Sequence, residues 1–268
     1  MLIWSMQNFS LNGHAGKLRA KRWDVQNPRY VVLLCHGYGE HIDRYDELAA
    51  RLNADGAQVY GLDHMGHGES EGERVLIDDF DAVVRDLHQL AELAHQEYRD
   101  VPQVLIGHSM GGMISARYIQ NYGKELKCAV LSGPLLDGKG LVDVLLGLPE
   151  IPNTPLDPAA LSRDLSVGEK YASDPLVWHG PFKRPMLEAM QKSLDAIQAN
   201  GAFQIPVLHL HGEADSIVNY PVTVAAWEKL KGAQGYSRSY PEARHEIFLE
   251  TNRQEVFSDL IKWVNQQL

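Results

Sequence analysis

The pattern Gly-x-Ser-x-Gly, which can present a reactive serine on a tight turn, occurs twice in the sequence. It reads GESEG at 68–72 and GHSMG at 107–111. A serine hydroxyl becomes an effective nucleophile when a neighbouring base accepts its proton, and a third group usually orients that base. The surroundings of each serine therefore decide which of the two is the candidate nucleophile.

Ser109 has the sequence context that this chemistry requires. It follows the apolar run VLIG at 104–107 and precedes apolar residues at helical spacing that end at Gly123, which predicts a strand-to-helix turn. The start of a helix also favours developing negative charge. Ser70 instead lies in a glycine-rich loop between two glutamates, whose carboxylates would oppose an oxyanion. We predict Ser109 as the nucleophile.

The order of the remaining residues suggests an acid and a base. In the α/β-hydrolase arrangement, the nucleophile is followed along the chain by Asp or Glu and then by His. Asp215 comes shortly after the apolar run PVLHLHG at 206–212, where a triad acid would stand, and Glu213 remains the alternative acid. Of the twelve histidines, only His245 lies beyond Asp215. We predict His245 as the base and Asp215 as the residue that orients it.

A tetrahedral oxyanion needs two backbone donors. One donor should be the N–H of Met110, the residue after the nucleophile, and the other the N–H of Tyr38 in the loop HGYGEH at 36–41. Several histidines lie near these motifs, but no pair has a convincing metal-ligand spacing. The sequence therefore predicts a site that works without a metal or an organic cofactor.

The elements that would position these residues alternate along the chain. Short apolar runs predict buried parallel strands at 30–37, 58–64, 103–109, 128–133 and 206–212. Amphipathic spacing predicts helices at 43–55, 78–98 and 252–267. Together they indicate an α/β fold with a mostly parallel, doubly wound sheet, whose ligands gather outside the carboxyl ends of the strands. The N-terminal segment predicts an antiparallel hairpin at one edge, turning near Asn12-Gly13.

One long interval interrupts this alternation. We interpret 136–203 as an inserted cap, or lid, over the strand ends, and 1–135 with 204–268 as the α/β-hydrolase core. The apolar run from Leu141 to Leu148 is far too short to cross a membrane. It either packs inside the cap, or lines an apolar channel with Leu145 and Leu146, or contacts lipid, and the sequence leaves these alternatives open.

Composition and charge limit the partners and the cellular location that we expect. The chain has 268 residues and a formal net charge of −10, which repels phosphate backbones and argues against nucleic acid as a partner. Its first residues lack a basic leader followed by a long apolar run, so we expect a cytoplasmic protein. Cys35 and Cys128 each lie in or beside a strand-like run, which predicts two buried, reduced thiols.

Taken in order, the motifs resemble those of monoacylglycerol lipases. They are HGYGEHIDRY, LDHMGHGESEGERVLIDDF, IGHSMGG, LSGP, SDPLVWHG, LHGEADSIV and RHEIFLE. The resemblance implies a cap that encloses a tunnel for one acyl chain, with a small polar pocket for glycerol near the triad. It also implies that Glu40 and Arg44 line the polar side of that pocket, although the pair could equally hold the loop as an ion pair. The cap follows the family pattern least closely.

From these observations we predict a serine hydrolase that cleaves monoacylglycerol to fatty acid and glycerol through an acyl-enzyme. A lysophospholipase or broad-specificity carboxylesterase is the alternative among enzymes. A catalytically dead lipid-binding or scaffold protein is the alternative outside them. The expected partner is a small lipid ester, met in the cytoplasm or at the periphery of a membrane, with transient contact between the cap and a membrane or micelle surface.

Overall fold

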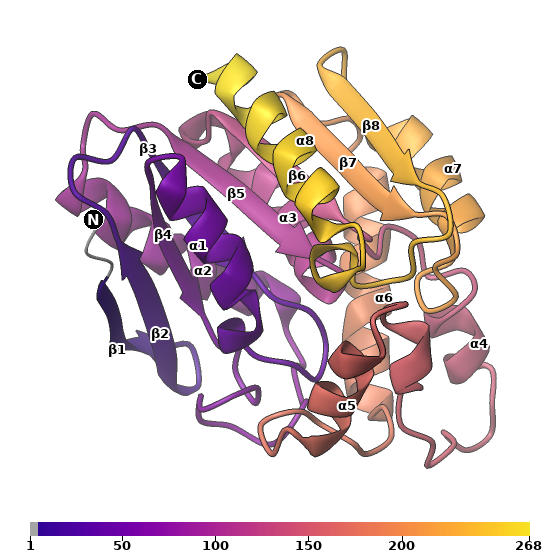
Figure 1. Cartoon of the computed structure of the whole chain (residues 1–268). Helices are drawn as coiled ribbons and strands as arrows, with labels where there is room; N and C mark the ends of the chain where they lie inside the picture. The colour runs from indigo at the N-terminus through magenta and orange to yellow at the C-terminus, as the bar shows by residue number, and fades with distance from the viewer. Residues whose placement is uncertain (1–4) are drawn as a thin grey trace.

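A single sheet organises the protein, which we describe from a computed structural model covering residues 5–268 (Figure 1). Within these residues, eight strands pair in the order β1-β2-β4-β3-β5-β6-β7-β8. The strands are β1 (Ser5–Gly13), β2 (Gly16–Asp24), β3 (Tyr30–Cys35), β4 (Ala57–Leu62), β5 (Gln103–His108), β6 (Cys128–Ser132), β7 (Val207–Gly212) and β8 (Gly235–Tyr240). Strand β1 pairs antiparallel with β2 and β2 with β4, whereas all other neighbours run parallel.

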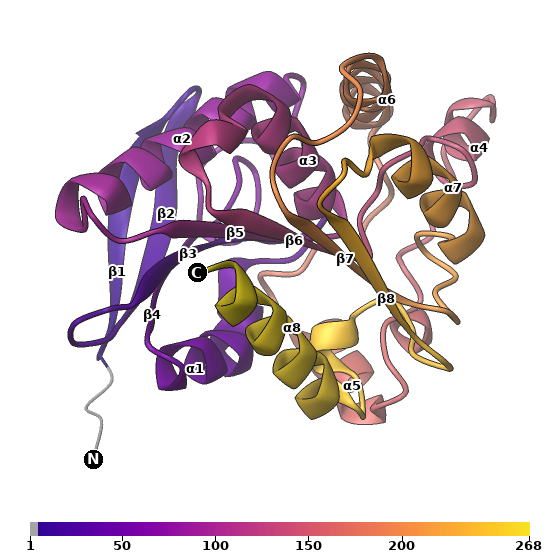
Figure 2. The same ribbon diagram turned by 90° about the horizontal axis from the view of Figure 1, so that it is seen from above.

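Helices cover both faces of the sheet (Figure 2). Helices α1 and α8 lie on one face, and α2, α3 and α6 lie on the other. The helices are α1 (Asp46–Ala54), α2 (Phe80–Glu97), α3 (Met110–Tyr122), α4 (Val142–Leu146), α5 (Leu165–Ser173), α6 (Arg184–Ala199), α7 (Tyr220–Leu230) and α8 (Arg253–Gln267). Short 3₁₀ turns are η1 (Ile42–Tyr45), η2 (Gly123–Glu125), η3 (Pro158–Ala160) and η4 (Ile247–Leu249). The predicted doubly wound α/β architecture is therefore confirmed.

The central strands form because their side chains are apolar on both faces. In β3, Val32 and Leu34 pack with α1 and α8, whereas Val31 and Leu33 pack with the helices on the opposite face. Every residue of β3 to β7 is buried. A parallel sheet buried on both faces brings its carboxyl-terminal ends to one edge, and the loops at that edge carry the residues with chemistry.

The interval between β6 and β7 has two parts. Helices α4 and α5 lie beyond the carboxyl ends of β6 and β7 (Figure 1), whereas α6 packs against α2 and α3. The segment 136–203 that we interpret as a cap thus includes a helix that packs against two core helices. We retain the cap as a proposal for the part that contains α4 and α5.

The predicted edge hairpin is present. It pairs Gly13 with Gly16, so its turn is formed by His14 and Ala15, directly after Asn12-Gly13. Helix α7 and strand β8, in contrast, are not predicted by the sequence patterns described above. Cys35 and Cys128 are buried free thiols, as predicted.

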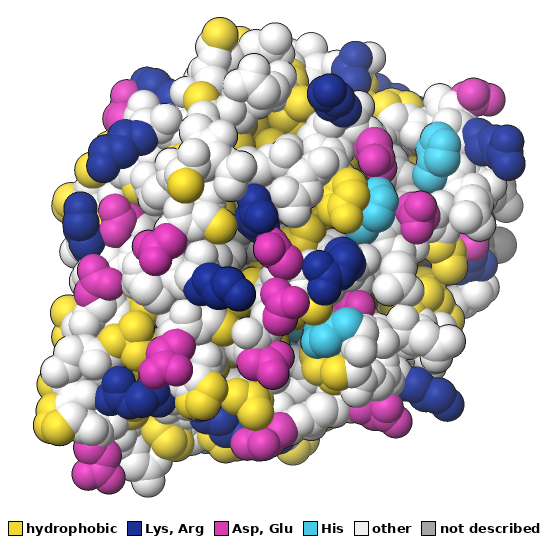
Figure 3. Space-filling model, turned by 180° about the vertical axis from the view of Figure 1, so that it is seen from behind, with side chains coloured by type: hydrophobic (Ala, Val, Ile, Leu, Met, Phe, Trp, Pro, Cys, Tyr) yellow, Lys and Arg dark blue, Asp and Glu magenta, His cyan; other side chains and the backbone are white. Residues whose placement is uncertain are grey.

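In residues 5–268, we find no helix that is both long and apolar enough to span a membrane. The face seen from behind mixes charged side chains of both signs with scattered apolar ones (Figure 3).

Candidate active site

Ser109 lies on a strained turn between β5 and α3. Its backbone has φ 56° and ψ −120°, a region that non-glycine residues rarely adopt and that costs on the order of 1–3 kcal/mol. The turn is fixed on both sides, because Ser109 N donates to Ser132 O at 2.9 Å and Leu135 N donates to Ser109 O at 3.1 Å. The turn raises the Ser109 hydroxyl above the carboxyl-terminal edge of the sheet, as the elbow pattern predicts.

The two glycines of this pattern are needed for close packing. A Cβ atom at Gly111 would lie 2.1 Å from the carbonyl oxygen of Cys35, and one at Gly107 would lie 2.1 Å from Ser115 Oγ. Both distances are shorter than any real contact of that kind. The first turn of α3 is therefore pressed against the end of β3, which brings the loop after β3 close to Ser109.

The three predicted triad residues meet at this edge. Ser109 Oγ lies 2.9 Å from His245 Nε2, and His245 Nδ1 lies 2.7 Å from Asp215 Oδ2. The other oxygen, Asp215 Oδ1, accepts hydrogen bonds from the backbone N–H groups of Ile217 and Val218, both at 2.9 Å. The alternative acid, Glu213, is exposed and accepts a hydrogen bond from Ser239 Oγ at 2.6 Å.

The surroundings shift the pKa values of His245 and Asp215. Burial disfavours the charged form of His245, but the nearby Asp215 carboxylate outweighs burial and raises the His245 pKa above 6.5. Burial alone would raise the pKa of Asp215, but His245 and hydrogen-bond donors lower it well below its ordinary value. Asp215 therefore stays ionised and can stabilise a protonated His245.

Tyr38 and Met110 line the cavity at Ser109 from two different elements. Among the hydrogen bonds of residues 5–268, none is donated by Tyr38 N or by Met110 N, which agrees with their predicted role as oxyanion donors. The loop carrying Tyr38 is braced because Gly37 N donates to Glu40 Oε1 at 2.6 Å. Trp178 N also donates to Gly39 O at 2.8 Å, which ties this loop to the interval between β6 and β7.

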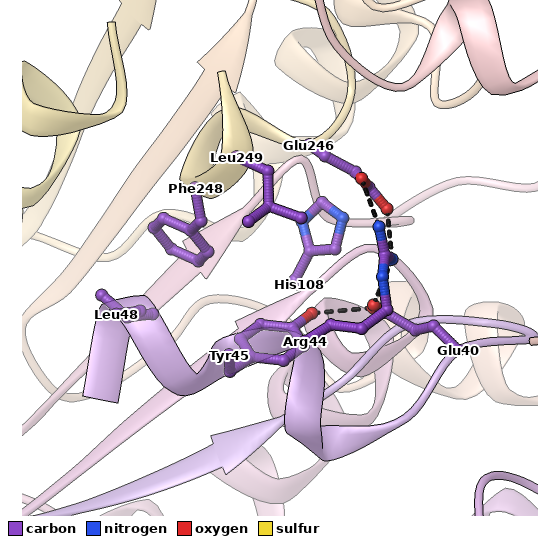
Figure 4. Close-up of a pocket in the computed structure, with 8 residues that line it drawn as sticks. All are labelled: Glu40, Arg44, Tyr45, Leu48, His108, Glu246, Phe248 and Leu249. Atoms are coloured by element: carbon purple, nitrogen blue, oxygen red, sulfur yellow. Dashed lines mark hydrogen bonds and ion pairs between the residues drawn. The ribbon is translucent and has the colours of Figure 1, made fainter. Parts of the chain in front are cut away.

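A buried cluster of charges lies beside His245. The Arg44 guanidinium lies between two carboxylates, 2.7 Å from Glu40 Oε2 and 2.7 Å from Glu246 Oε2 (Figure 4). Tyr45 OH donates to Glu40 Oε1 at 2.7 Å. Burial opposes the ionised form of Glu40, but Arg44 and the other partners lower its pKa. Glu40 and Arg44 therefore form the ion pair that was one of our two interpretations.

Glu246 completes this cluster and was not predicted. It directly follows His245 in the sequence, and it contacts Arg44 across about two hundred residues of chain, a pairing that no local pattern indicates. Glu40, Arg44 and Glu246 also line the cavity that contains Ser109 and His245. The ion pair and a position on the polar wall of the cavity are thus compatible.

The rest of this cavity is largely apolar. Its apolar lining comes from Leu135, Leu141, Leu156, Leu161, Phe182, Met190, Ile217 and Val218. Leu141 therefore lines the cavity, whereas the predicted channel residues Leu145 and Leu146 do not and pack partly buried against the core. Helix α4, which carries both leucines, packs against α6. A role for Leu145 and Leu146 along an acyl channel therefore stays a prediction.

The other serine of the repeated pattern has a different environment. Ser70 Oγ donates to Asp63 O at 2.6 Å and accepts from Arg19 N at 2.9 Å. Both partners are backbone atoms, so the hydroxyl ties the loop to β2. His36 and His64 support the same region, since His64 N donates to His36 Nε2 at 3.0 Å. Within residues 5–268, no group of three or more His, Cys, Asp or Glu side chains could hold a metal ion.

Comparison with known proteins places this geometry in context. The family model described as serine aminopeptidase, S33, matches residues 26–252. A monoacylglycerol lipase of Mycolicibacterium smegmatis is 34% identical over 252 residues, 90% of each chain. The human monoglyceride lipase is 31% identical over 255 residues, 90% of this chain and 84% of its own. A soluble variant of the Saccharomyces cerevisiae monoglyceride lipase, solved with a substrate analogue, has a TM-score of 0.83 at 25% identity and covers 97% and 94% of the two chains.

Proposed function

The chain belongs to the monoacylglycerol lipase family of α/β-hydrolases, and we propose that it cleaves the ester bond of monoacylglycerols to give a fatty acid and glycerol. The observation that carries this proposal is the contact of Ser109 with His245 and of His245 with Asp215, made at a largely apolar cavity that has one polar wall. Such a cavity suits an acyl chain on one side and a hydroxylated headgroup on the other.

The first half of the reaction follows from these contacts. Ser109 Oγ attacks the ester carbonyl carbon while His245 Nε2 accepts its proton, and Asp215 stabilises the resulting imidazolium. The carbonyl oxygen becomes an oxyanion that accepts hydrogen bonds from the N–H groups of Tyr38 and Met110. His245 then donates its proton to the leaving glycerol oxygen, and an acyl-Ser109 ester remains.

The second half repeats this sequence with water. His245 removes a proton from a water molecule, and the resulting hydroxide attacks the acyl carbonyl. The tetrahedral intermediate uses the same two N–H groups. When it collapses, the carbon–oxygen bond to Ser109 breaks, Ser109 Oγ takes back the proton from His245, and the fatty acid leaves.

The charges of the polar wall support glycerol rather than a phosphate headgroup. Glu40 and Glu246 share one guanidinium, that of Arg44, so the three side chains carry a net negative charge. A lysophospholipid phosphate would face two carboxylates with the nearby cation already paired, which is unfavourable. An uncharged glycerol headgroup avoids this repulsion.

The experiment that tests the substrate class compares hydrolysis rates with one acyl chain on different headgroups. We expect monoacylglycerol to be cleaved at least roughly 100-fold faster than triacylglycerol or lysophosphatidylcholine, a gap of about 2.7 kcal/mol in transition-state binding. An aminoacyl p-nitroanilide is included because the family description names an aminopeptidase. Comparable rates on triacylglycerol would indicate a general lipase, and faster cleavage of the anilide would indicate a peptidase.

Chain-length preference tests the apolar part of the cavity. Leu141 lines the cavity and Leu145 does not, so the two leucines are a matched pair. Each buried methylene of a substrate can contribute up to about 0.8 kcal/mol. Leu141→Asp should therefore lower kcat/KM for long-chain esters far more than for acetate esters, whereas Leu145→Asp should affect both about equally. A larger loss on long-chain esters in Leu145→Asp than in Leu141→Asp would instead indicate that Leu145 lines the acyl channel.

The protein must also reach a lipid substrate, and we propose that it does so in the cytoplasm through transient contact with a membrane or micelle surface. Two apolar side chains between β6 and β7 support this contact, since Val144 is 57% exposed and Leu165 is 73% exposed. Co-sedimentation with phosphatidylcholine vesicles should be weaker for a Val144→Ser, Leu165→Ser variant. Unchanged co-sedimentation would contradict the contact, and cell fractionation would test the compartment.

A further inference from the structure

Behind Asp215 lie two buried histidines for which the reaction above has no use. His211 Nε2 is 3.0 Å from Asp215 Oδ2, the oxygen that also pairs with His245, and 3.0 Å from Val218 O. His211 Nδ1 is 3.2 Å from His209 Nε2, and His209 Nδ1 is 2.9 Å from Ser237 Oγ. A continuous row of polar atoms thus connects the triad acid to the exposed strand β8.

The sheet produces this row through its periodicity and register. Residues 209 and 211 are two apart in β7, so their side chains lie on the same face of the sheet. His209 is the register partner of Ser237 in β8. Both histidines are fully buried, and the rings of Trp227 and Tyr220 lie 5.2 and 5.4 Å from those of His209 and His211. Buried imidazoles among aromatic rings are costly unless both nitrogens are hydrogen-bonded.

The partners determine where the hydrogens lie when the rings are neutral. His211 Nε2 faces two oxygens that accept, so it carries the hydrogen, and Nδ1 must then accept from His209 Nε2. His209 Nδ1 is left to accept from the hydroxyl of Ser237. Burial lowers the His209 pKa to about 3, which keeps this ring neutral. Every donor in the row therefore points toward Asp215.

We propose that His211, supported by His209, is a positioning residue for the proposed ester hydrolysis. The N–H of His211 donates a hydrogen bond that holds the Asp215 carboxylate in place and makes this carboxylate less basic. The inference rests on the proposed function. Asp215 has two backbone donors on Oδ1, whereas Oδ2 depends on His245 and His211. No proton needs to move along the row, because its effect comes from the orientation of the dipoles.

The direction of the expected effect follows from the charges around His245. Besides Asp215, the ionisable side chains around His245 are Glu246, which follows it in the chain, Glu40 with Arg44, and His108. All of them stay unchanged in the test. Removing the His211 N–H would leave a more basic carboxylate, which favours the protonated form of His245. The pKa of His245 should therefore rise, while a less firmly oriented Asp215 should lower the maximal rate.

The test is the pH profile of kcat/KM on a p-nitrophenyl ester for a graded set of variants. His211→Leu should lower the plateau by roughly tenfold, as expected for a lost charge-assisted hydrogen bond, and move the acid limb upward by about half a pH unit. His209→Leu should act in the same direction but less. Ser237→Ala, at the exposed end, should stay within about twofold.

His211→Gln is the conservative variant, because an amide can both donate to Asp215 and accept from His209. It should restore the position of the acid limb and most of the plateau. A His211→Leu profile with a lowered plateau but an unmoved acid limb would reduce His211 to a packing role and overturn the proposal, as would failure of His211→Gln to restore the limb.

Nitrogen NMR of the ¹⁵N-histidine-labelled wild-type protein is a second test, and it does not depend on the folding of any variant. We expect His211 to carry its hydrogen on Nε2 alone, and His209 likewise. A hydrogen on His211 Nδ1 would overturn the proposed direction of the row. A wild-type protein that cleaves no ester would instead contradict the proposed function, and the nitrogen spectrum would still test the row.

Discussion

The two Gly-x-Ser-x-Gly segments share a pattern but have little else in common. Ser109 lies on a left-handed turn between a buried strand and a helix, with its hydroxyl next to His245. Ser70 lies in a loop at the edge of the sheet, and its hydroxyl is bonded to backbone atoms of Asp63 and Arg19. In the first segment the protein leaves the hydroxyl available to a base, and in the second it uses the hydroxyl as a structural tie.

This difference shows what the short pattern does and does not determine. The glycines of both segments permit a tight turn, but only flanking elements of the right kind aim the serine at a base. At 107–111 the strand before and the helix after the serine press the turn against the end of β3. At 68–72 the glycines serve a loop that folds around the Asp63 carboxylate, since Glu69 N donates to Asp63 Oδ2 at 2.9 Å.

Removing each hydroxyl should give the largest contrast. Ser109→Ala should lower kcat by roughly 10⁴ to 10⁶, as loss of a triad nucleophile does elsewhere, because no other hydroxyl can form the acyl-enzyme. Ser70→Ala should stay within about tenfold of wild type. The measurement is ester hydrolysis together with labelling by a fluorophosphonate probe. Labelling that survives in Ser109→Ala but not in Ser70→Ala would reverse the assignment of the two serines.

Changing one glycine in each segment tests the packing around the serines. In Gly111→Ala the new methyl group would meet the backbone carbonyl of Cys35, so α3 must shift and separate the Met110 and Tyr38 amides. A displacement of about 1 Å can cost roughly 100-fold in rate. In Gly72→Ala the new methyl group would meet chiefly the flexible Met65 side chain, and the φ of 106° adds local strain. The loop at 68–72 does not line the cavity that contains Ser109, so kcat/KM should stay within about tenfold. Equal losses, measured on soluble protein with a native far-UV spectrum, would show that neither glycine acts on the site specifically.

The histidine partner of Ser109 predicts a pH dependence that Ser70 cannot produce. His245 must be neutral to accept the serine proton, and its pKa is raised above 6.5, so the rate should fall as the pH drops through that raised value. Well below it, kcat/KM should fall by about tenfold per pH unit and level off above it. Ser70→Ala should have the same profile as wild type. A profile flat from pH 5 to 8 would remove His245 from the role of base.

The smallest expected effects concern thermal stability. Here we expect the substitution at Ser70, not the one at Ser109, to be the harmful one. Ser70→Ala leaves the buried Asp63 carbonyl and Arg19 N–H without their shared partner, which should cost about 1 kcal/mol and lower Tm by roughly 2 to 4 °C. Ser109→Gly relieves a left-handed backbone and should raise Tm slightly. Thermal unfolding followed by circular dichroism checks both. A stabilised Ser70→Ala would contradict its structural role.

Much of the fold and of the triad could be predicted from the sequence, because buried parallel strands and amphipathic helices have strong periodic patterns. The strands that carry Ser109 and precede Asp215 are apolar throughout, and their observed ends lie within about two residues of the predicted ones. His245 could be chosen because chain order left one histidine. The family resemblance added the headgroup and the acyl chain, which no periodicity indicates.

What could not be predicted depends on side-chain contacts between distant segments or on exposed elements. Strand β8 has the polar sequence GYSRSY at an exposed edge, so it lacks the apolar run by which the other strands were found. Glu246 meets Arg44 only after the chain has folded. The apolar character of Leu145 and Leu146 is equally compatible with packing and with lining a channel, so the sequence could not tell that they pack against the core.

The source of the cavity lining has a consequence for how such an enzyme can evolve or be redesigned. Leu141, Leu156 and Leu161 line the cavity from the segment between β6 and β7, which does not contribute Ser109, Asp215 or His245. Ser109 instead is surrounded by glycines that tolerate no added atom. A mutant library confined to these leucines can therefore explore new acyl specificities while the reacting residues remain fixed, whereas a library spread over 107–111 would consist mostly of inactive proteins.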